Sequence, residues 1–238
     1  MTLPARLPDG GDAVLKICFP HRESAFEADA LERWDGVGAV RLLAHDNERA
    51  ALLIERCRPG TQLHEAGPAT ALDVLVGLLA RLWVPAGEPF GSLSEEASWW
   101  ASYLPERWEN AGRPFERRLL DAALTAIEEL VPTQGEQVLI HQDLHGANVL
   151  RAQREPWLAI DPKPLVGERE FGVAPVVRSP ELGYSERDLR YRLDRLAGDL
   201  ELDRERARLW TLAQSIAWCI GGNHHERHAQ TARWLLAA

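Results

Sequence analysis

The sequence has few of the residues from which disulfide-stapled and zinc-stapled domains are built. Its 238 residues include three cysteines, Cys18, Cys57 and Cys219, which lie far apart and form no Cys-x-x-Cys pair. This pattern argues against a disulfide framework and favours reduced thiols in a cytoplasmic protein. No apolar run approaches the roughly 18 residues of a membrane helix, and the N-terminus lacks the layout of a signal peptide. We therefore expect a cytoplasmic protein with no membrane partner.

Lysine is scarcer still. The formal net charge is −9, and of the 27 basic residues only Lys16 and Lys163 are lysines. An acidic chain is a poor partner for the phosphate backbone of nucleic acids and is compatible with a small cationic ligand. The sequence sets no oligomeric state. Because all the other basic residues are arginines, the positions of these two lysines in the sequence are informative.

Hydrophobic residues make up 45% of the chain, enough for a sizeable core. The first third has the pattern of a strand, a helix and two strands, at Ala13–Phe19, Ser24–Trp34, Ala39–Leu43 and Ala51–Ile54. From about Ala69 a 3.6-residue period predicts helices at Ala71–Trp83, Ser94–Trp108 and Pro114–Leu130, and again from about Ser185. Short β-like pieces interrupt this helical part at Gln137–Ile140, Ala147–Leu150 and Trp157–Ile160.

The run Arg58-Pro59-Gly60 separates the β-rich beginning from the helical remainder. We therefore predict an α+β fold with a small lobe at residues 1–58 and a larger, mostly helical lobe at residues 59–238. The β-like pieces lie inside the larger lobe.

A polar cluster follows the first β-like piece. The pattern His141-x-Asp143-x-x-x-x-Asn148 has the spacing of a kinase catalytic loop, in which the Asp orients and deprotonates a hydroxyl and the Asn binds Mg²⁺. Phosphoryl transfer needs a carboxylate near the nucleophile and an oxygen ligand on the metal a few ångströms away, and a loop of this length supplies both. We expect His141 to pack and to hydrogen-bond the backbone.

Three further residues extend the pattern in the order found in kinases. Asp161 follows the last β-like piece, where a second Mg²⁺ ligand is expected. Lys16 lies in a strand similar to the one that carries the phosphate-binding lysine, and Glu27 is placed to pair with it. Glu27 also fits a capping box begun by Ser24, and Glu32 is a rival partner for the lysine.

These residues resemble the aminoglycoside phosphotransferase family of the kinase-like fold, and most of all its streptomycin 6-kinase and hydroxyurea-antibiotic kinase branch. The resemblance rests on His141–Leu150 and on Trp157–Gly167, where Asp-Pro-Lys-Pro replaces the Asp-Phe-Gly of protein kinases. Trp34-Asp35-Gly36 with Ala39–Leu43, and Asp203–Ala207, are also similar to that branch.

The resemblance implies an ATP- and Mg²⁺-dependent enzyme that phosphorylates a hydroxyl of a streptomycin-like aminocyclitol antibiotic. Asp143 would be the catalytic base, with Asn148 and Asp161 as metal ligands. The cofactor-binding residues would be Lys16, Glu27, Glu55 within the adenine-binding segment Leu53–Arg58, and Lys163. For Lys163 the residues themselves leave two interpretations: it touches phosphate, or it neutralises neighbouring carboxylates.

Fifteen residues precede Lys16, whereas members of the family have two more strands and a nucleotide-covering loop there. The resemblance therefore implies an N-lobe that is shortened. Two alternatives to an active kinase follow: a catalytically silent kinase-like domain that binds a small molecule or a protein, and a fragment of a longer kinase.

Overall fold

The structure is a computed structural model that describes residues 1–19, 21–22, 25–220 and 225–238. It divides into two compact units, Met1–Phe90 with Leu139–Leu165, and Gly91–Val138 with Val166–Ala238. The first unit therefore contains both the N-terminal sheet and the predicted catalytic loop. Residue 58, where the sequence predicts the boundary between two lobes, lies inside the first unit. The division into lobes stays a prediction. The predicted start of the first helix at Ser24 lies outside the described residues.

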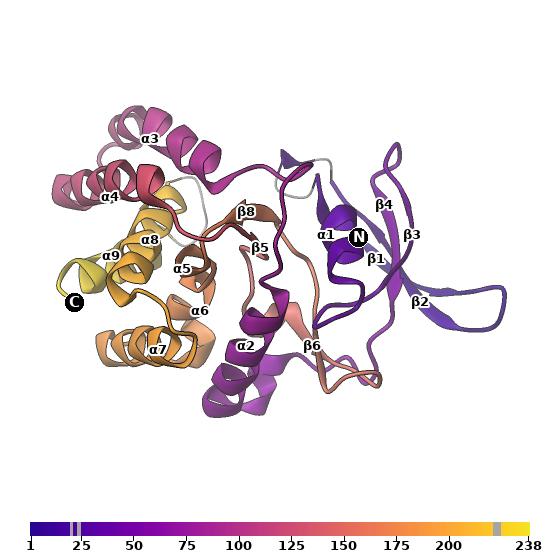
Figure 1. The fold of residues 1–238 in the computed structure, drawn as a ribbon. Helices are drawn as coiled ribbons and strands as arrows, with labels where there is room; N and C mark the ends of the chain where they lie inside the picture. The colour runs from indigo at the N-terminus through magenta and orange to yellow at the C-terminus, as the bar shows by residue number, and fades with distance from the viewer. Residues whose placement is uncertain (20, 23–24, 221–224) are drawn as a thin grey trace. The chain divides into compact units, whose positions relative to one another are not determined.

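The first unit is built on an antiparallel sheet with the strand order β1-β2-β4-β3 (Figure 1). Its strands are β1 (Thr2–Arg6), β2 (Asp12–Ile17), β3 (Leu42–Asp46) and β4 (Ala51–Glu55). Alternation along β4 buries Leu52 and Ile54, and α1 (Glu27–Trp34) packs beside β3. The helix ends at Asp35, which has a left-handed φ of 45°.

The rest of the first unit surrounds a second, smaller hairpin. It comprises η2 (Leu63–Ala66), α2 (Pro68–Leu82), η4 (Gly146–Asn148), β6 (Val149–Arg151) and β7 (Trp157–Ala159). Strands β6 and β7 pair antiparallel. The linker after α1 runs beside β7, since the backbone N–H of Val40 donates to the carbonyl of Ala159 (3.0 Å) and that of Ala159 donates to the carbonyl of Gly38 (2.9 Å). These bonds hold the end of β7, and so Asp161, next to the segment that follows α1.

The second unit is helical and centred on α8. Its elements are α3 (Leu93–Asn110), α4 (Arg117–Leu130), η3 (Val131–Thr133), α5 (Arg169–Gly172), α6 (Ala174–Val177), η5 (Pro180–Leu182), α7 (Glu186–Asp199), α8 (Arg204–Ala217) and α9 (His225–Leu236). Helix α8 contacts α4, α5, α6, α7 and α9. Residues 210–217 of α8 are all buried, and they include the polar residues Thr211, Gln214 and Ser215.

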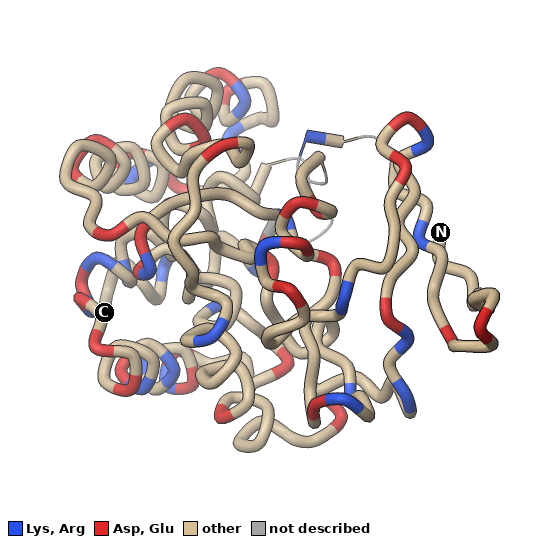
Figure 2. The backbone as a smooth tube through the Cα atoms, turned by 45° about the vertical axis from the view of Figure 1, so that its right-hand side comes forward, with Lys and Arg blue, Asp and Glu red and all other residues tan. Residues whose placement is uncertain are grey.

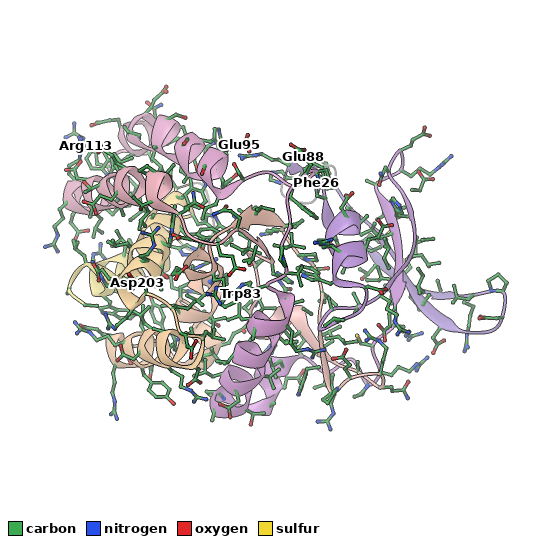
Figure 3. All side chains as sticks on the ribbon, in the orientation of Figure 1. Phe26, Trp83, Glu88, Glu95, Arg113 and Asp203 are labelled. Atoms are coloured by element: carbon green, nitrogen blue, oxygen red, sulfur yellow. The ribbon has the colours of Figure 1, made fainter. Side chains whose placement is uncertain are left out.

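Helix starts in the second unit follow ordinary capping chemistry. Ser92 and Glu95 form a reciprocal capping box at α3, and the Asp203 carboxylate accepts the backbone N–H groups of Glu205 (2.9 Å) and Arg206 (3.1 Å) at α8. Figure 3 labels Glu95 and Asp203 at these two helix starts. The chain passes between the units after Phe90, within β5 (Val138–Ile140) and within β8 (Leu165–Gly167).

The predicted α+β class is confirmed, and most predicted elements lie within three residues of the observed ones. Strands β1 and β8 and the short helices α5 and α6 have no counterpart in the prediction. The piece predicted as a strand at Ala147–Leu150 begins as the 3-10 turn η4. Acidic and basic residues are interspersed along the backbone (Figure 2). Among the described residues, none of the helices has both the length and the apolarity that crossing a bilayer requires.

Candidate active site

Lys16 is the centre of the first cluster of site residues. Its ammonium lies 2.6 and 2.7 Å from the two carboxylate oxygens of Glu27 and 2.7 Å from Oδ1 of Asp161. Strand β2 supplies the lysine, the first turn of α1 supplies Glu27, and the end of β7 supplies Asp161. The predicted ion pair between Lys16 and Glu27 is therefore present. Two carboxylates that lie far apart in the sequence therefore contact the same ammonium group.

Glu27, and not Glu32, is the partner of Lys16. The Glu27 side chain is 3% exposed, whereas that of Glu32 is 60% exposed and lies 3.6 Å from Nε2 of His45. The residue at the N-cap of α1 is Phe26, with Glu27 following as the first helical residue. Both carboxylate oxygens of Glu27 face the lysine, so its role here is the ion pair.

The electrostatics of this pair keep the lysine charged. Burial alone would lower the pKa of Lys16, but the attraction of Glu27 and Asp161 outweighs it and leaves that pKa raised. Burial also raises the pKa of Glu27, and the attraction of Lys16 works against that rise. The thiol of Cys18 lies 3.5 Å from the second oxygen of Glu27, and burial followed by the repulsion of Glu27 raises the pKa of the thiol. Lys16 is thus a fixed cation in a mostly buried setting.

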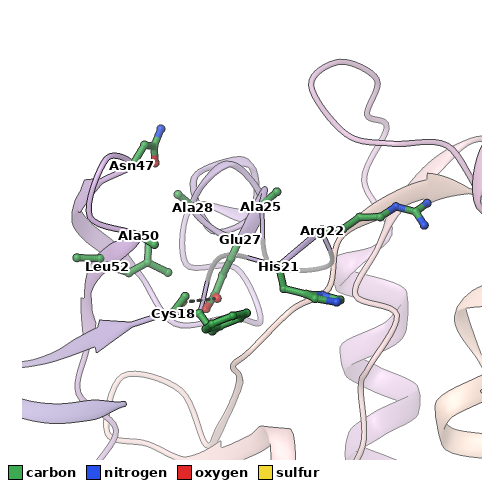
Figure 4. Close-up of a pocket in the computed structure, with 11 residues that line it drawn as sticks. Cys18, His21, Arg22, Ala25, Glu27, Ala28, Asn47, Ala50 and Leu52 are labelled. Carbon is green, nitrogen blue, oxygen red and sulfur yellow. Dashed lines mark hydrogen bonds between the residues drawn. The ribbon is translucent and has the colours of Figure 1, made fainter. Parts of the chain in front are cut away.

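Glu27 also lines a pocket (Figure 4). It has a volume of 440 Å³ and is lined by Cys18, Phe19, His21, Arg22, Ala25, Glu27, Ala28, Asn47, Ala50, Ala51 and Leu52. Figure 4 shows Cys18 and Glu27 side by side, joined by the dashed hydrogen bond. Alanines and Leu52 supply apolar wall, and His21 and Arg22 add ionisable side chains to the lining beside Glu27.

Asp143 is the centre of the second cluster. Its Oδ2 lies 3.2 Å from the ammonium of Lys163, and its Oδ1 lies 3.8 Å from Nε2 of His145. The backbone N–H of Asp143 donates to the carbonyl of His141 (2.8 Å), and the intervening Gln142 has a φ of 62°. A positive φ at a residue other than glycine is uncommon and is typical of tightly constrained loops. Of the two interpretations of Lys163, its contact with Asp143 fits the neutralising one.

Hydrogen bonds order the loop that carries Asp143 and Asn148 and join it to the loop that carries Asp161. Asn148 donates from Nδ2 to the carbonyl of Asp143 (2.9 Å) and accepts at its own carbonyl from the backbone N–H of Ile160 (2.9 Å). The backbone N–H of Lys163 donates to the carbonyl of His141 (2.9 Å). Asp161, between these two contacts, has a φ of 55°. The loops that carry Asp143, Asn148 and Asp161 are therefore one hydrogen-bonded assembly.

The donor set of Asn148 and Asp161 suits Mg²⁺. Because the Asn148 amide nitrogen donates to a carbonyl, its amide oxygen is the atom left to bind a cation, and Asp161 adds a carboxylate that is 47% exposed. Mg²⁺ is usually held by one or two protein oxygens together with phosphates and water. In the described part of the chain no group of three or more His, Cys, Asp and Glu residues gathers as a metal cage. The site therefore fits a cation that arrives with a phosphate ligand.

His141 has the structural role expected from its position. Its Nε2 lies 3.0 Å from the carbonyl of Ile160, and the backbone N–H of Asp143 donates to its Nδ1 (3.4 Å). The ring stacks on Trp34, with ring centroids 6.0 Å apart and planes 18° apart. Burial lowers the pKa of His141 to about 4, with the attraction of Asp143 only partly opposing this. Nδ1 therefore accepts a bond, and protonation there would break it.

This arrangement predicts a loss of stability in mild acid. Below pH 6.5 the histidine takes up a proton in the unfolded chain but not in the folded one, so the free energy of unfolding falls as the pH drops from 6.5 towards 4. The total effect of this residue is about 3 kcal/mol. Urea unfolding of the wild type and His141→Asn at several pH values measures it. The variant should have a flatter profile in that range, and parallel profiles would contradict the assignment.

The structure does not bring the side chain of Glu55 to either cluster. Its carboxylate accepts three bonds from the guanidinium of Arg154, at 3.0, 3.1 and 2.9 Å, and one from the backbone N–H of Arg41 (3.1 Å). Binding of adenine by the segment that contains Glu55 stays a prediction, and the carboxylate itself is engaged elsewhere. The sequence does not identify Arg154 as a partner of Glu55, because no local pattern distinguishes it from the other arginines of the chain.

Comparisons with known proteins place the chain in a family. Residues 1–221 match the profile of the aminoglycoside/hydroxyurea antibiotic resistance kinases. The chain is 42% identical over 224 residues to the hydroxyurea phosphotransferase of Kitasatospora aureofaciens, covering 92% of this chain and 65% of that protein. It is 40% identical over 230 residues to the streptomycin 6-kinase of Streptomyces griseus, covering 92% and 75%. The chain thus spans less than two thirds of the length of the first relative.

Solved structures agree on the fold. A choline kinase from Streptococcus pneumoniae superposes with a TM-score of 0.70 at 14% identity, covering 99% of this chain and 89% of that one. A thermostable mutant of the aminoglycoside phosphotransferase APH(4)-Ia, in a ternary complex with ADP and hygromycin B, gives a TM-score of 0.67 at 12% identity, covering 99% and 88%. The predicted kinase-like fold is confirmed. With its profile match and its 40–42% identity to two kinases, this chain belongs to the aminoglycoside/hydroxyurea antibiotic resistance kinase family, a family of small-molecule kinases.

Proposed function

We propose that this protein transfers the γ-phosphoryl group of ATP to a hydroxyl of a streptomycin-like aminocyclitol, with Mg²⁺ bound to the nucleotide. The observation that supports the proposal is the convergence of Lys16, Glu27 and Asp161, because it brings a cation suited to binding phosphate next to a carboxylate suited to binding a metal ion. The net charge of −9 suits a cationic acceptor. The two kinds of relative leave two acceptor classes to compare, aminocyclitols and hydroxyurea.

In this mechanism each residue has one task. Lys16 binds the α- and β-phosphates, held in place by Glu27. Asp143 accepts the proton of the acceptor hydroxyl as its oxygen forms the bond to phosphorus and ADP leaves. Asn148 and Asp161 hold Mg²⁺, which when bound neutralises charge on the β- and γ-phosphates. Positioning and charge neutralisation supply most of the rate enhancement in such reactions.

Lys163 has a supporting task in the same proposal. Its ammonium contacts the Asp143 carboxylate at 3.2 Å, so it holds the base in one orientation before the acceptor arrives. Because the lysine reaches Asp143 from the loop that also carries Asp161, it couples the base to the metal-binding segment. The cationic head can also approach the transferring phosphoryl group.

The test is a product assay. The purified chain is incubated with Mg-ATP and either streptomycin or hydroxyurea, and the acceptor is examined by mass spectrometry for one added phosphoryl group. A phosphorylated aminocyclitol is the expected result, and a phosphorylated hydroxyurea alone would move the substrate to the other class. No product from either acceptor, together with intact binding of Mg-ATP, would favour a silent binding domain.

A further inference from the structure

Arg154 uses its whole guanidinium on neighbours within the first unit. Besides its three bonds to Glu55, it donates from Nη1 to the carbonyl of Gly36 (2.7 Å) and to Glu155 (3.0 Å), and from Nη2 to the carbonyl of Ala39 (2.9 Å). Its side chain is 23% exposed. We call Arg154, Glu55 and the carbonyls of Gly36 and Ala39 the Arg154 clamp. A planar group with five donors in a fixed fork is needed to make all these bonds, and lysine cannot replace it.

The residues of the Arg154 clamp come from three separate segments of the chain. Glu55 ends β4 and lies in the predicted adenine-binding segment Leu53–Arg58. Gly36 and Ala39 belong to the linker after α1, the helix that begins with Glu27. Arg154 itself lies in the turn between β6 and β7. The sequence separations of these contacts are 99, 118 and 115 residues.

The turn that contains Arg154 joins β6 to β7, and these two strands adjoin Asn148 and Asp161. Strand β6 begins directly after Asn148, and Asp161 follows closely on the end of β7, so the hairpin that Arg154 anchors carries both proposed metal ligands near its open end. Strand β7 is also bonded to the linker after α1. Fixing the turn at one end of this short hairpin therefore fixes the register between the proposed adenine-binding segment and the metal ligands.

Two further contacts show that the clamp is built tightly. The second carboxylate oxygen of Glu155 accepts from Arg81 on α2 (2.7 Å), which anchors the turn a second time. Gly36 has a φ of +78°, and a Cβ there would lie 2.8 Å from Cγ of Arg41 and 3.3 Å from Nη2 of Arg154. Only glycine fits this approach. The Trp34-Asp35-Gly36 run thus has a packing reason that its sequence pattern alone does not reveal.

We propose that Arg154 is a positioning residue for nucleotide binding: it holds the segment Leu53–Arg58 in register with Asn148 and Asp161, so that adenine and the metal-bound phosphates are bound at a fixed separation. This inference rests on the proposed function and deepens it. Arg154 touches neither the nucleotide nor the acceptor in this account. Its loss should therefore affect nucleotide binding more than acceptor binding.

The experiment compares Arg154→Lys and Arg154→Met with Arg151→Met, a matched control in the same hairpin whose guanidinium stacks on Trp157 at 5.8 Å. Hydrogen exchange of the folded proteins is measured first, because it needs no nucleotide. Both Arg154 variants should lose protection at the amides of Val40, Arg41 and Glu55, while the control keeps it. Unchanged protection there in a folded Arg154 variant would overturn the clamp as a positioning device.

Steady-state kinetics then separate positioning from general damage. In Arg154→Lys the KM for ATP should rise about tenfold or more, as expected for the loss of a charge-assisted bidentate contact, while the KM for the acceptor stays unchanged. A fall in kcat with both KM values unchanged would mean a smaller folded fraction and would overturn the proposal. If the wild type binds no Mg-ATP, the proposed function fails, and the exchange result still decides whether Arg154 fixes these segments.

Discussion

Replacing Asp143 by asparagine should lower kcat by about a thousandfold and change the affinity for Mg-ATP by less than about threefold. The substitution keeps the size of the side chain and removes the proton acceptor. Asp143 reaches Lys163 at 3.2 Å but lies outside the Lys16 cluster, so nucleotide binding has no reason to change. Single-turnover kinetics with saturating acceptor, together with a calorimetric Kd for Mg-ATP, measure the two quantities separately.

Asp121→Asn is the control for this variant. Asp121 is an exposed aspartate of α4 that pairs with Arg117 at 2.8 Å, so the same chemical change is made on a helix outside the catalytic loop. Its kcat should stay within about twofold of the wild type, because exposed helix pairs contribute little. An Asp143→Asn enzyme that retains more than about a tenth of the wild-type kcat would remove Asp143 from the proton transfer.

Replacing Lys16 by methionine should weaken Mg-ATP binding by about a hundredfold and should also destabilise the fold by about 3 kcal/mol. The first effect is the lost contact with phosphate. The second arises because Glu27, 3% exposed, would be left buried without its cation. Isothermal titration and urea unfolding report the two effects independently.

The stability of Lys16→Met should also depend on pH in a definite direction. Burial raises the pKa of Glu27, and losing Lys16 removes the attraction that opposes this rise. The folded variant therefore holds a proton on Glu27 at pH values where the unfolded chain has released it, and its stability falls as the pH rises above the ordinary titration range of a glutamate.

A double variant separates the structural from the functional part. Lys16→Met with Glu27→Gln removes the buried charge, so it should recover most of the lost stability and its pH dependence. It should not recover nucleotide affinity, since the phosphate contact is still absent. Recovery of Mg-ATP binding in the double variant would show that Lys16 acts only by neutralising Glu27, and the proposed phosphate contact would be wrong.

The candidate site residues that the sequence predicts lie in chain order at the ends of apolar segments. Asp143, Asn148 and Asp161 each follow or flank a short β-like run, and β-structure places such residues at one edge. Lys16 lies within a strand, and Glu27 begins the next helix, so their meeting follows from local pattern and chain order. The spacing of His141, Asp143 and Asn148 within one loop can be seen directly in a single sequence.

The sequence does not reveal the Arg154 clamp or strand β1. The first depends on contacts between distant residues, and the second has only a weak local pattern. The clamp formed by Arg154 joins residues about a hundred positions apart, and nothing near Arg154 distinguishes it from other surface arginines. Strand β1 escapes prediction because Pro4 interrupts its pattern, although proline is tolerated on an edge strand that needs no bond from that position. Its pairing with β2 completes the order of the sheet.

The contact of Lys163 with Asp143 is an intermediate case. The Asp-Pro-Lys-Pro run is visible in the sequence and marks the branch of the family. Which carboxylate the lysine meets depends on how the loop after β7 folds back, and that is fixed by the bond from the backbone N–H of Lys163 to the carbonyl of His141. The sequence predicts Lys163 as a site residue, but it does not predict which carboxylate the lysine contacts.

The most direct measurement is a calorimetric titration of the 238-residue chain with Mg-ATP, beside the variant Asp161→Ala. Asp161 is half-exposed, and Lys16 keeps its pair with Glu27 when Asp161 is removed, so the substitution takes away a carboxylate of the proposed metal site without leaving a buried charge unpaired. We predict binding by the wild type that the variant weakens by about tenfold or more and that depends on Mg²⁺. Binding of equal strength by both proteins, or no binding by a well-folded wild type, would contradict the account of a working nucleotide site.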